Sequence, residues 1–280
     1  MSRFYSVTLL SLSMLFCSGS LRAQMPFYTD DSAVTEPGKF HVEVFDEIDG
    51  LQSSQFPDLR QNTANLKLNF SPVRHLELDV DAPYLAIYRT PGSRTSRGVG
   101  DTNLGAKWNM RESSPDSRLP AFAASLYIEF PTGDARQELG SGLTDYWLNF
   151  ILQEPLSDKT RFNINLGVLF AGNTSTGVVG IQTRRGHVYT GGISLLHDLS
   201  PRLTLGGELY GGISDSAGLD RTQLQAMFGA QYAVRNGMTF CLGILGGKYG
   251  ATPRIGGQLG VSMDFPDVLG SSGSGQAGSP

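Results

Sequence analysis

Apolar and polar residues alternate along much of the chain between residues 39 and 265. The pattern is clearest over residues 160–171, where Phe162, Ile164 and Leu166 are apolar and the positions between them are polar or small. Side chains of a β-strand point alternately to opposite faces, so this pattern predicts strands with one apolar and one polar face. No segment of useful length shows the 3.6-residue period of a helix.

Twelve such segments are expected. Their ranges are 39–49, 62–70, 75–88, 101–110, 121–130, 144–153, 160–171, 187–196, 203–213, 222–234, 238–249 and 254–265. The regular recurrence of neighbouring pairs is typical of repeated hairpins rather than of a duplicated domain.

The connections between these segments alternate in length. After even-numbered segments they are mostly short and rich in turn residues, as at 235–237, whereas after odd-numbered segments they are mostly longer, as at 172–186. The connections 111–120 and 250–253 are exceptions. Short turns at one end and long loops at the other are typical of outer-membrane barrels, and a soluble β-sandwich gives no reason for them. The sequence therefore predicts an all-β fold, a transmembrane antiparallel β-barrel of about twelve strands with up-and-down topology.

The end of the last strand agrees with this fold. Residues 255–265 alternate and end in an aromatic residue, Phe265. They resemble the C-terminal signal by which bacterial outer-membrane barrels are handed to their assembly machinery. The assembly machinery and outer-membrane lipid are therefore expected partners of the barrel at 39–265. Residues 266–280 are rich in Gly and Ser and are expected to form a disordered tail.

The first residues have the features of a secretory signal peptide. Arg3 precedes an apolar run at 7–16, and residues 21–23 offer a cleavage site before Gln24. The run is too short to span a bilayer, which takes about 20 residues. We therefore expect residues 1–23 to be removed on export and the mature protein to lie in the outer membrane of a Gram-negative cell.

The net charge and the cysteine content exclude some kinds of partner and of covalent cross-link. Residues 1–23 contain two arginines and no acid, so their removal changes the formal net charge from −4 to −6. An acidic chain without a basic patch does not favour nucleic acid as a partner. Cys241 is the one cysteine after residue 23, so no disulfide bond within the mature chain is expected.

Charged residues fall in the polar register of the predicted strands and would point into the lumen. The candidates for lining it are Lys67, Lys107, Glu129, Asp145, Arg161 and Glu208. In one interpretation these charges pair across a filled interior, and in the other they line a permeation path or a binding site. Small barrels are packed and large ones leave a channel, so a barrel of about twelve strands leaves both interpretations open.

Residues 24–38 form an arm before the first strand. The arm combines aromatic with acidic residues, namely Phe27, Tyr28, Asp30 and Asp31. In one interpretation it is a periplasmic leader, and in the other it is a plug that lies in the lumen. Inside the lumen, Lys67, Lys107 and Arg161 would provide partners for the two aspartates, at a lower local dielectric.

Three short motifs occur in order along the chain. They are residues 26–38 (PFYTDDSAVTEPG), residues 98–101 (GVGD) ahead of Lys107 and Trp108, and residues 130–134 (FPTGD). In this combination the chain resembles the family of outer-membrane transporters named for the meta-pathway of phenol degradation, over most of residues 26–265. The resemblance implies a barrel that transports a small, hydrophobic or aromatic molecule of unknown identity, and it brings no catalytic residues.

The Gly-Asp pairs in these motifs have an explanation that needs no ligand. Glycine permits positive φ in a turn, and aspartate accepts hydrogen bonds from backbone amides there. A cation site in the loops is the alternative, although hard cations need several oxygen ligands.

Catalytic, metal and cofactor sites are not expected. The four histidines lack metal-ligand spacing, and no grouping of Ser, His and acid matches nucleophilic catalysis. We therefore expect a channel or transporter rather than an enzyme. The alternatives are an outer-membrane enzyme, such as a lipid hydrolase, and a structural or adhesive barrel.

Overall fold

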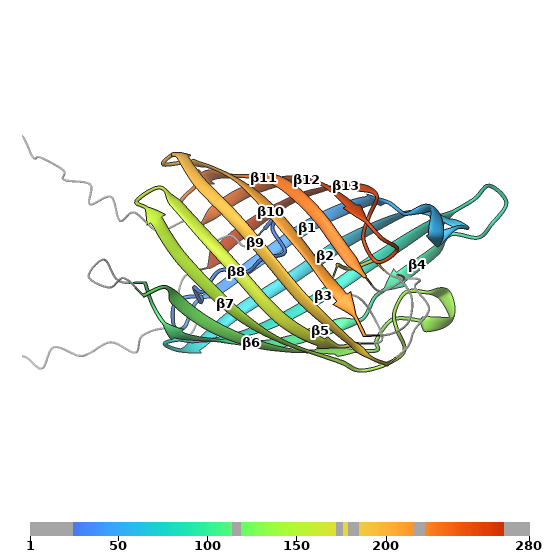
Figure 1. Cartoon of the computed structure of the whole chain (residues 1–280), viewed down its shortest axis with the longest axis horizontal. Helices are drawn as coiled ribbons and strands as arrows, with labels where there is room; N and C mark the ends of the chain where they lie inside the picture. The colour runs from blue at the N-terminus through green and yellow to red at the C-terminus, as the bar shows by residue number, and fades with distance from the viewer. Residues whose placement is uncertain (1–24, 114–118, 172–175, 179–184, 216–221, 266–280) are drawn as a thin grey trace, which may run out of the picture.

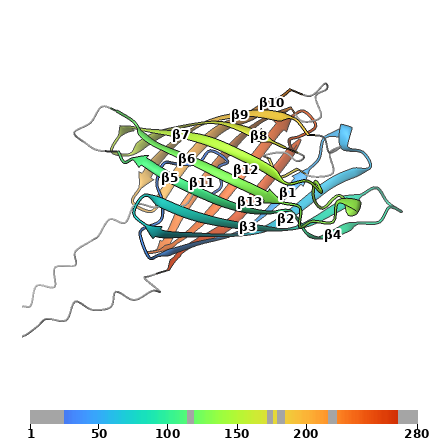
Figure 2. The ribbon, with the colours of Figure 1, turned by 90° about the horizontal axis from the view of Figure 1, so that it is seen from below.

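The alternating segments form long strands that close into one antiparallel barrel. The computed structural model describes residues 25–113, 119–171, 176–178, 185–215 and 222–265. The predicted signal peptide and the predicted disordered tail lie outside these ranges. Consecutive strands of the barrel wall are neighbours in the sheet, which is the expected up-and-down topology (Figures 1 and 2).

Twelve strands form the wall, so the predicted fold class and strand number are confirmed. The wall strands are β1 (Phe40–Gly50), β2 (Asp58–Val73), β3 (Leu76–Arg89), β5 (Thr102–Arg111), β6 (Ala121–Phe130), β7 (Asp145–Ser157), β8 (Thr160–Phe170), β9 (His187–Ser200), β10 (Leu203–Ser214), β11 (Gln223–Arg235), β12 (Met238–Lys248) and β13 (Ile255–Phe265). Two short 3₁₀-helices, η1 (Ser53–Gln55) and η2 (Ala135–Gln137), lie in loops. Among the described residues, no helix has the length and apolar character needed to cross a membrane.

The barrel closes where the first strand meets the last. On β1, Phe40 is paired with Phe265 of β13 on one side and with Phe70 of β2 on the other. The rings of Phe40 and Phe70 stack with their centroids 4.6 Å apart. Because short turns mark the periplasmic end of outer-membrane barrels, we assign the end that carries these residues to the periplasm.

Some residues that were expected in external loops belong to strands instead. The loop expected at 50–61 is shorter because β2 begins at Asp58. A further strand, β4 (Ser96–Val99), pairs with β3 inside the connection expected at 89–100. These extensions include polar residues such as Arg60 and Arg97. Outside the bilayer neither strand face must be apolar, so pairing continues there without the alternation that predicted the other strands.

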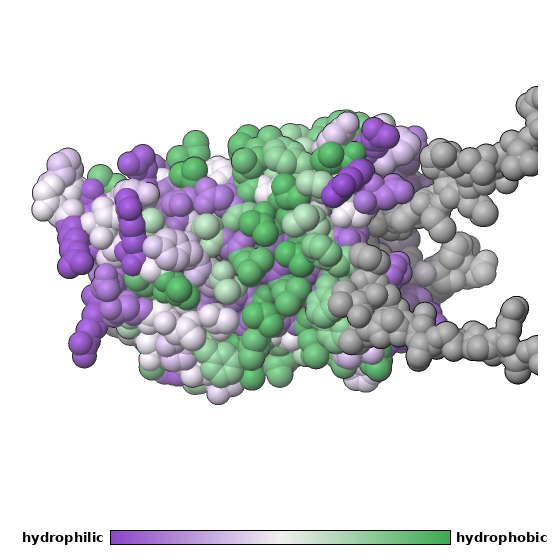
Figure 3. Space-filling view, turned by 180° about the vertical axis from the view of Figure 1, so that it is seen from behind, coloured by the Kyte–Doolittle hydropathy of each residue, from purple (hydrophilic) through white to green (hydrophobic). Residues whose placement is uncertain are grey.

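The outer surface of the wall is an apolar belt. Figure 3 shows apolar residues gathered around the middle of the barrel and polar residues toward its ends. Leu166, Phe228 and Ile244 are 58%, 56% and 63% exposed on this face, whereas the adjacent Asn165 is 2% exposed. In a membrane, lipid covers this belt, and the polar register faces the lumen.

Deleting residues 255–280 is expected to prevent assembly in the membrane. The strand β13 is hydrogen-bonded to both β12 and β1, so its loss leaves two open edges that lipid cannot satisfy. A chain that lacks only residues 266–280 keeps β13 and is expected to reach the membrane normally. Membrane fractionation and heat-modifiable migration on gels measure both outcomes. Normal membrane levels of the longer deletion would contradict this role of β13.

Candidate functional site

The arm before β1 lies inside the barrel. Met25, Phe27 and Asp30 are 4%, 6% and 5% exposed, although none of them belongs to a strand. The arm meets the wall at the periplasmic rim, where the Gly38 amide donates to the Ser71 carbonyl at 2.8 Å. From there it runs back into the lumen, where its path is visible in Figures 1 and 2.

Phe27 packs against the side of the lumen formed by β9 to β12. Its apolar neighbours are Leu196, Met227 and Leu245. The ring also lies against Gly206 and Gly229, where an added Cβ would come within 2.6 Å and 3.2 Å of it. The missing side chains at these two positions leave the space that the ring occupies.

Polar side chains of the wall hold the backbone of the next residues. The Glu208 carboxylate accepts from both the amide and the hydroxyl of Thr29, at 2.5 Å and 2.7 Å. Asn165 accepts from the Asp30 amide at 2.7 Å and donates to the Asp30 carbonyl at 2.9 Å. Gln231 donates to the Met25 carbonyl at 2.7 Å. Because these hydrogen bonds are made to buried backbone groups, they hold the arm at a defined position in the lumen.

Lys107 links the arm to the opposite side of the wall. Its Nζ lies 3.1 Å from Asp30 Oδ1 and 3.3 Å from Glu77 Oε1. Glu77 in turn accepts from the amide and the hydroxyl of Thr35, both at 2.6 Å. Because all of these charges are buried and hydrogen-bonded, removing one partner leaves the other uncompensated, which costs about 3–5 kcal/mol in comparable buried pairs.

The other predicted partners of the arm are placed differently. Arg161 lies toward the periplasmic end and pairs with Asp198 at 3.2 Å, so it does not bind the acids of the arm as expected. The Asp31 carboxylate accepts from the amide of Ala33 at 2.9 Å, a hydrogen bond within the arm itself. The reach of Arg161 depends on its height in the barrel, which alternation alone does not reveal.

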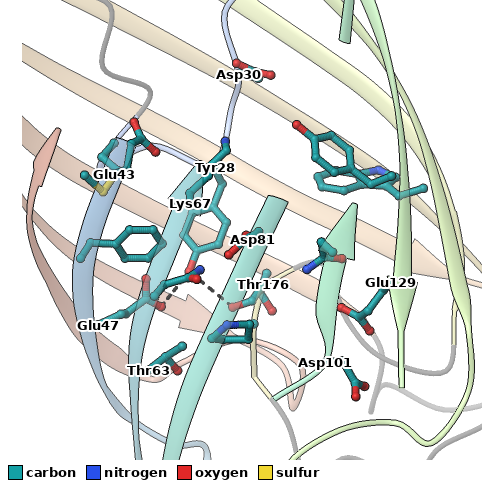
Figure 4. A pocket seen from close by; sticks show the side chains of 18 of the residues that line it. Tyr28, Asp30, Glu43, Glu47, Thr63, Lys67, Asp81, Asp101, Glu129 and Thr176 are labelled. Carbon is teal, nitrogen blue, oxygen red and sulfur yellow. Dashed lines mark hydrogen bonds between the residues drawn. The ribbon is translucent and has the colours of Figure 1, made fainter. Parts of the chain in front are cut away.

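Beside the arm is a cavity of about 260 Å³. Three of the candidate lumen residues line it, namely Lys67, Glu129 and Asp145, whereas Lys107 and Glu208 contact the arm. Its walls come mainly from β1 to β3 and β5 to β7, and Tyr28 of the arm also faces it (Figure 4). The lining contains one lysine, Lys67, and seven carboxylates: Asp30, Glu43, Glu47, Asp81, Asp101, Glu129 and Asp145.

Tyr28 joins the arm to the far side of the cavity. Its hydroxyl donates to Glu47 Oε1 at 2.7 Å and lies 3.4 Å from the carbonyl oxygen of Thr176 (Figure 4). Thr176 and Val178 belong to the connection between β8 and β9 and are fully buried, and Gln61 donates to the Gly177 carbonyl at 2.8 Å. Sequence reasoning placed these residues in an external loop, because nothing in their pattern signals that a loop folds inward.

The Gly-Asp motifs organise the loops at the extracellular end. The Asp101 carboxylate accepts from the amides of Gly133 at 2.9 Å and Ser141 at 2.7 Å, and Asp134 accepts from the amide of Arg136 at 2.9 Å. Burial raises the pKa of Asp101 above its ordinary value, and the two amide hydrogen bonds oppose that rise. The two aspartates thus have the turn role expected of them. The motif glycines Gly98, Gly100 and Gly133 do not adopt the expected positive φ. They permit close packing instead, since a Cβ on Gly133 would lie 2.4 Å from the Leu139 carbonyl oxygen.

Groups suited to catalysis or metal binding do not stand out in the described ranges. No cluster of three or more His, Cys, Asp or Glu side chains there is placed to hold a metal ion. Among the described residues, His41 and His187 are bonded to carboxylates and His197 to a threonine hydroxyl, and none of them to a serine. Cys241 is buried as a thiol.

Several solved structures share this architecture. An outer membrane channel of the COG4313 group from Pseudomonas putida F1 matches with a TM-score of 0.62 and 14% identity, over 84% of this chain and 98% of that one. The KdgM porin in complex with disordered oligogalacturonate matches with a TM-score of 0.51 and 11% identity, over 80% and 99%. The NanC porin matches with a TM-score of 0.51 and 11% identity, over 79% and 98%. At these identities the likeness establishes the fold.

A comparison with curated proteins found no match. A family model is matched over residues 26–265, which include the whole barrel and all but the first two residues of the arm. The three motifs that suggested a family in the sequence all lie within that range, and they form the arm and the loop-organising turns described above. The chain therefore belongs to the family described as MetA-pathway of phenol degradation.

Proposed function

We propose that the protein is an outer-membrane channel for small molecules. The observation that carries this proposal is the cavity of about 260 Å³ inside a closed barrel, between the arm and the inward-folded residues 176–178. A barrel with a purely structural or adhesive role has no need of a polar interior with space in it. The solved structures of similar fold include channels and porins, which supports the same function.

The outer surface and the last strand of the barrel support a location in the outer membrane. The apolar belt fits the lipid of the outer membrane, and β13 with its terminal Phe265 fits recognition by the barrel assembly machinery. An exported chain begins with residues like 1–23, so we infer delivery by a signal peptide. The family description supports a small aromatic or hydrophobic molecule as the cargo.

Reconstitution in planar bilayers tests the proposal. The refolded barrel is expected to give discrete current steps, and a salt gradient is expected to show a preference for cations. The preference follows from the lining, where carboxylates still outnumber Lys67 after Asp30 is paired with Lys107 and Asp145 with Arg185. Heat-unfolded protein in the same detergent is the control. Silent membranes with barrel that is verifiably folded and inserted would reject the channel function and leave the adhesive or structural alternative.

A lipid hydrolase remains the enzymatic alternative. It would require a serine activated by a base within hydrogen-bond reach. Incubation of the folded barrel with phospholipid vesicles, followed by analysis of released fatty acids, measures that activity directly. We expect no release above the level of a vesicle-only control.

A further inference from the structure

Two aromatic side chains form a patch on the wall of the cavity. Tyr127 of β6 and Trp147 of β7 are direct cross-strand partners, and both line the cavity. Their ring centroids are 6.0 Å apart, with 38° between the ring planes. Phe27 of the arm packs on the opposite side of the lumen, against β9 to β12.

Each ring is held against the wall over a glycine. A Cβ on Gly105 would lie 2.2 Å from the Tyr127 ring, and a Cβ on Gly167 would lie 2.7 Å from Trp147 Nε1. The Tyr127 hydroxyl donates to Asp79 Oδ2 at 2.8 Å, and Trp147 Nε1 donates to Thr190 Oγ1 at 3.3 Å. The polar atoms of both rings are thus engaged by the wall, which leaves their faces as the surface offered to the cavity.

A row of charged and polar residues borders the patch toward the extracellular end. Successive cross-strand partners around the wall form this row: Lys67, Asp81, Asn103, Glu129 and Asp145. The row lies two residues along the strands from the patch, which is about 7 Å. In Figure 4, Lys67, Asp81 and Glu129 are seen around the same space. A cation that rests over the patch can therefore reach carboxylates on its extracellular side.

Oxygen acceptors border the patch on its other side. Ser125 and Asn149 are cross-strand partners there and are 2% and 4% exposed. Within the described part of the chain, Ser125 Oγ, Asn149 Oδ1 and Asp81 Oδ1 are buried without a hydrogen-bond partner. Buried polar atoms rarely lack a hydrogen-bond partner, and each one that does lowers the stability of the fold by about 1–3 kcal/mol. Their side chains belong to the lining of the cavity, so a rotation of Ser125 or Asn149 would present its oxygen to a ligand with hydrogen-bond donors.

We propose that this cavity binds a small aromatic amine, an inference that rests on the proposed channel function. The ring of the ligand lies on Tyr127 and Trp147, and its ammonium group points to the row that contains Asp81 and Glu129. A hydroxyl on the far side of the ring donates to the oxygens of Ser125 and Asn149. Asp30 and Asp145 are paired with Lys107 and Arg185, and the other carboxylates of the lining still outnumber Lys67, which favours a cation over a neutral or anionic molecule of the same shape.

Tryptophan fluorescence tests the proposal without any measurement of transport. The chain has two tryptophans, Trp147 in the cavity and Trp108 on the lipid face, where it is 57% exposed. Trp108→Phe leaves Trp147 as the reporter of the cavity. The probes are tyramine, 4-ethylphenol and 3-(4-hydroxyphenyl)propionate, which share a phenol ring and differ in charge. Trp147→Phe leaves Trp108 and reports probe that merely enters the detergent.

We expect tyramine to change Trp147 emission with saturation, and to bind at least tenfold more tightly than the other two probes. Asp81→Asn and Glu129→Gln are each expected to weaken tyramine binding about tenfold, whereas Asp158→Asn, which removes a charge from an exposed turn, is expected to have no effect. Equal binding of tyramine and 4-ethylphenol, no saturable change with any probe, or unaltered tyramine binding in both variants would each overturn the proposal. Selective binding by a barrel that carries no current would support the site and reject the channel, and a conducting barrel without selective binding would do the reverse.

Discussion

Removal of residues 26–36 is expected to raise single-channel conductance severalfold. The arm fills one side of the lumen, where Phe27 packs on β9 to β12 and Asp30 is bound by Lys107 across the lumen. None of the deleted residues 26–36 belongs to a strand, so the backbone hydrogen bonds between the strands of the wall remain intact without them. The truncated chain is refolded from Gln24 onward and compared with the full-length mature chain in planar bilayers.

A milder variant separates release of the arm from its deletion. Glu208→Ala removes the acceptor of both hydrogen bonds from Thr29. We expect it to raise conductance less than the deletion does, or to add brief openings to the trace. The same conductance in the deletion variant and the parent, with heat-modifiable barrel in both, would mean that the arm does not restrict the path.

Leu166→Arg is expected to be the most damaging single substitution on the wall of the barrel. Leu166 is 58% exposed on the apolar face of β8, near the middle of the strand. An arginine on the lipid face near the bilayer midplane costs about 2–4 kcal/mol. We expect a lower yield of heat-modifiable barrel and a lower urea concentration at the midpoint of unfolding in lipid vesicles.

The matched control places the same residue inside. Asn103 lines the cavity, and its cross-strand partners are Asp81 and Glu129, so Asn103→Arg gains two acidic neighbours. We expect near-normal folding of this variant. The adjacent lumen residue Asn165 is not a suitable control, because both ends of its amide hold the Asp30 backbone. Equal losses for Leu166→Arg and Asn103→Arg would show that the assignment of faces is wrong.

The wall of the barrel could be predicted from the sequence because a strand in a membrane has only two environments. Lipid requires apolar residues on one face and the lumen accepts polar ones on the other, so each strand records its orientation as alternation. The prediction located β6 to the residue, at Ala121–Phe130. It failed at Asp58 and in β4, where the strands continue beyond the bilayer and the requirement ends.

The interior could be predicted only in part. Alternation indicates that Lys107 and Arg161 share the lumen face, but it does not give the contacts that each makes across the barrel. Lys107 meets the arm, whereas Arg161 pairs with Asp198 on the neighbouring strand. The aromatic patch could not be predicted, because nothing in the sequence distinguishes Tyr127 and Trp147 from the other residues of their strands. Their role depends on Gly105 and Gly167, which come next to them only through strand pairing.

The position of the arm also constrains the order in which the protein folds. Several of its bonds to the wall join residues far apart in the chain, with a sequence separation of 206 for Met25 and Gln231 and of 179 for Thr29 and Glu208. Contacts of such long sequence separation form late, because the entropy of closing the intervening loop must first be overcome. The surface that receives Phe27 does not exist until β9 to β12 have assembled. We therefore expect docking of residues 25–29 on β9 to β12 to follow the assembly of those strands.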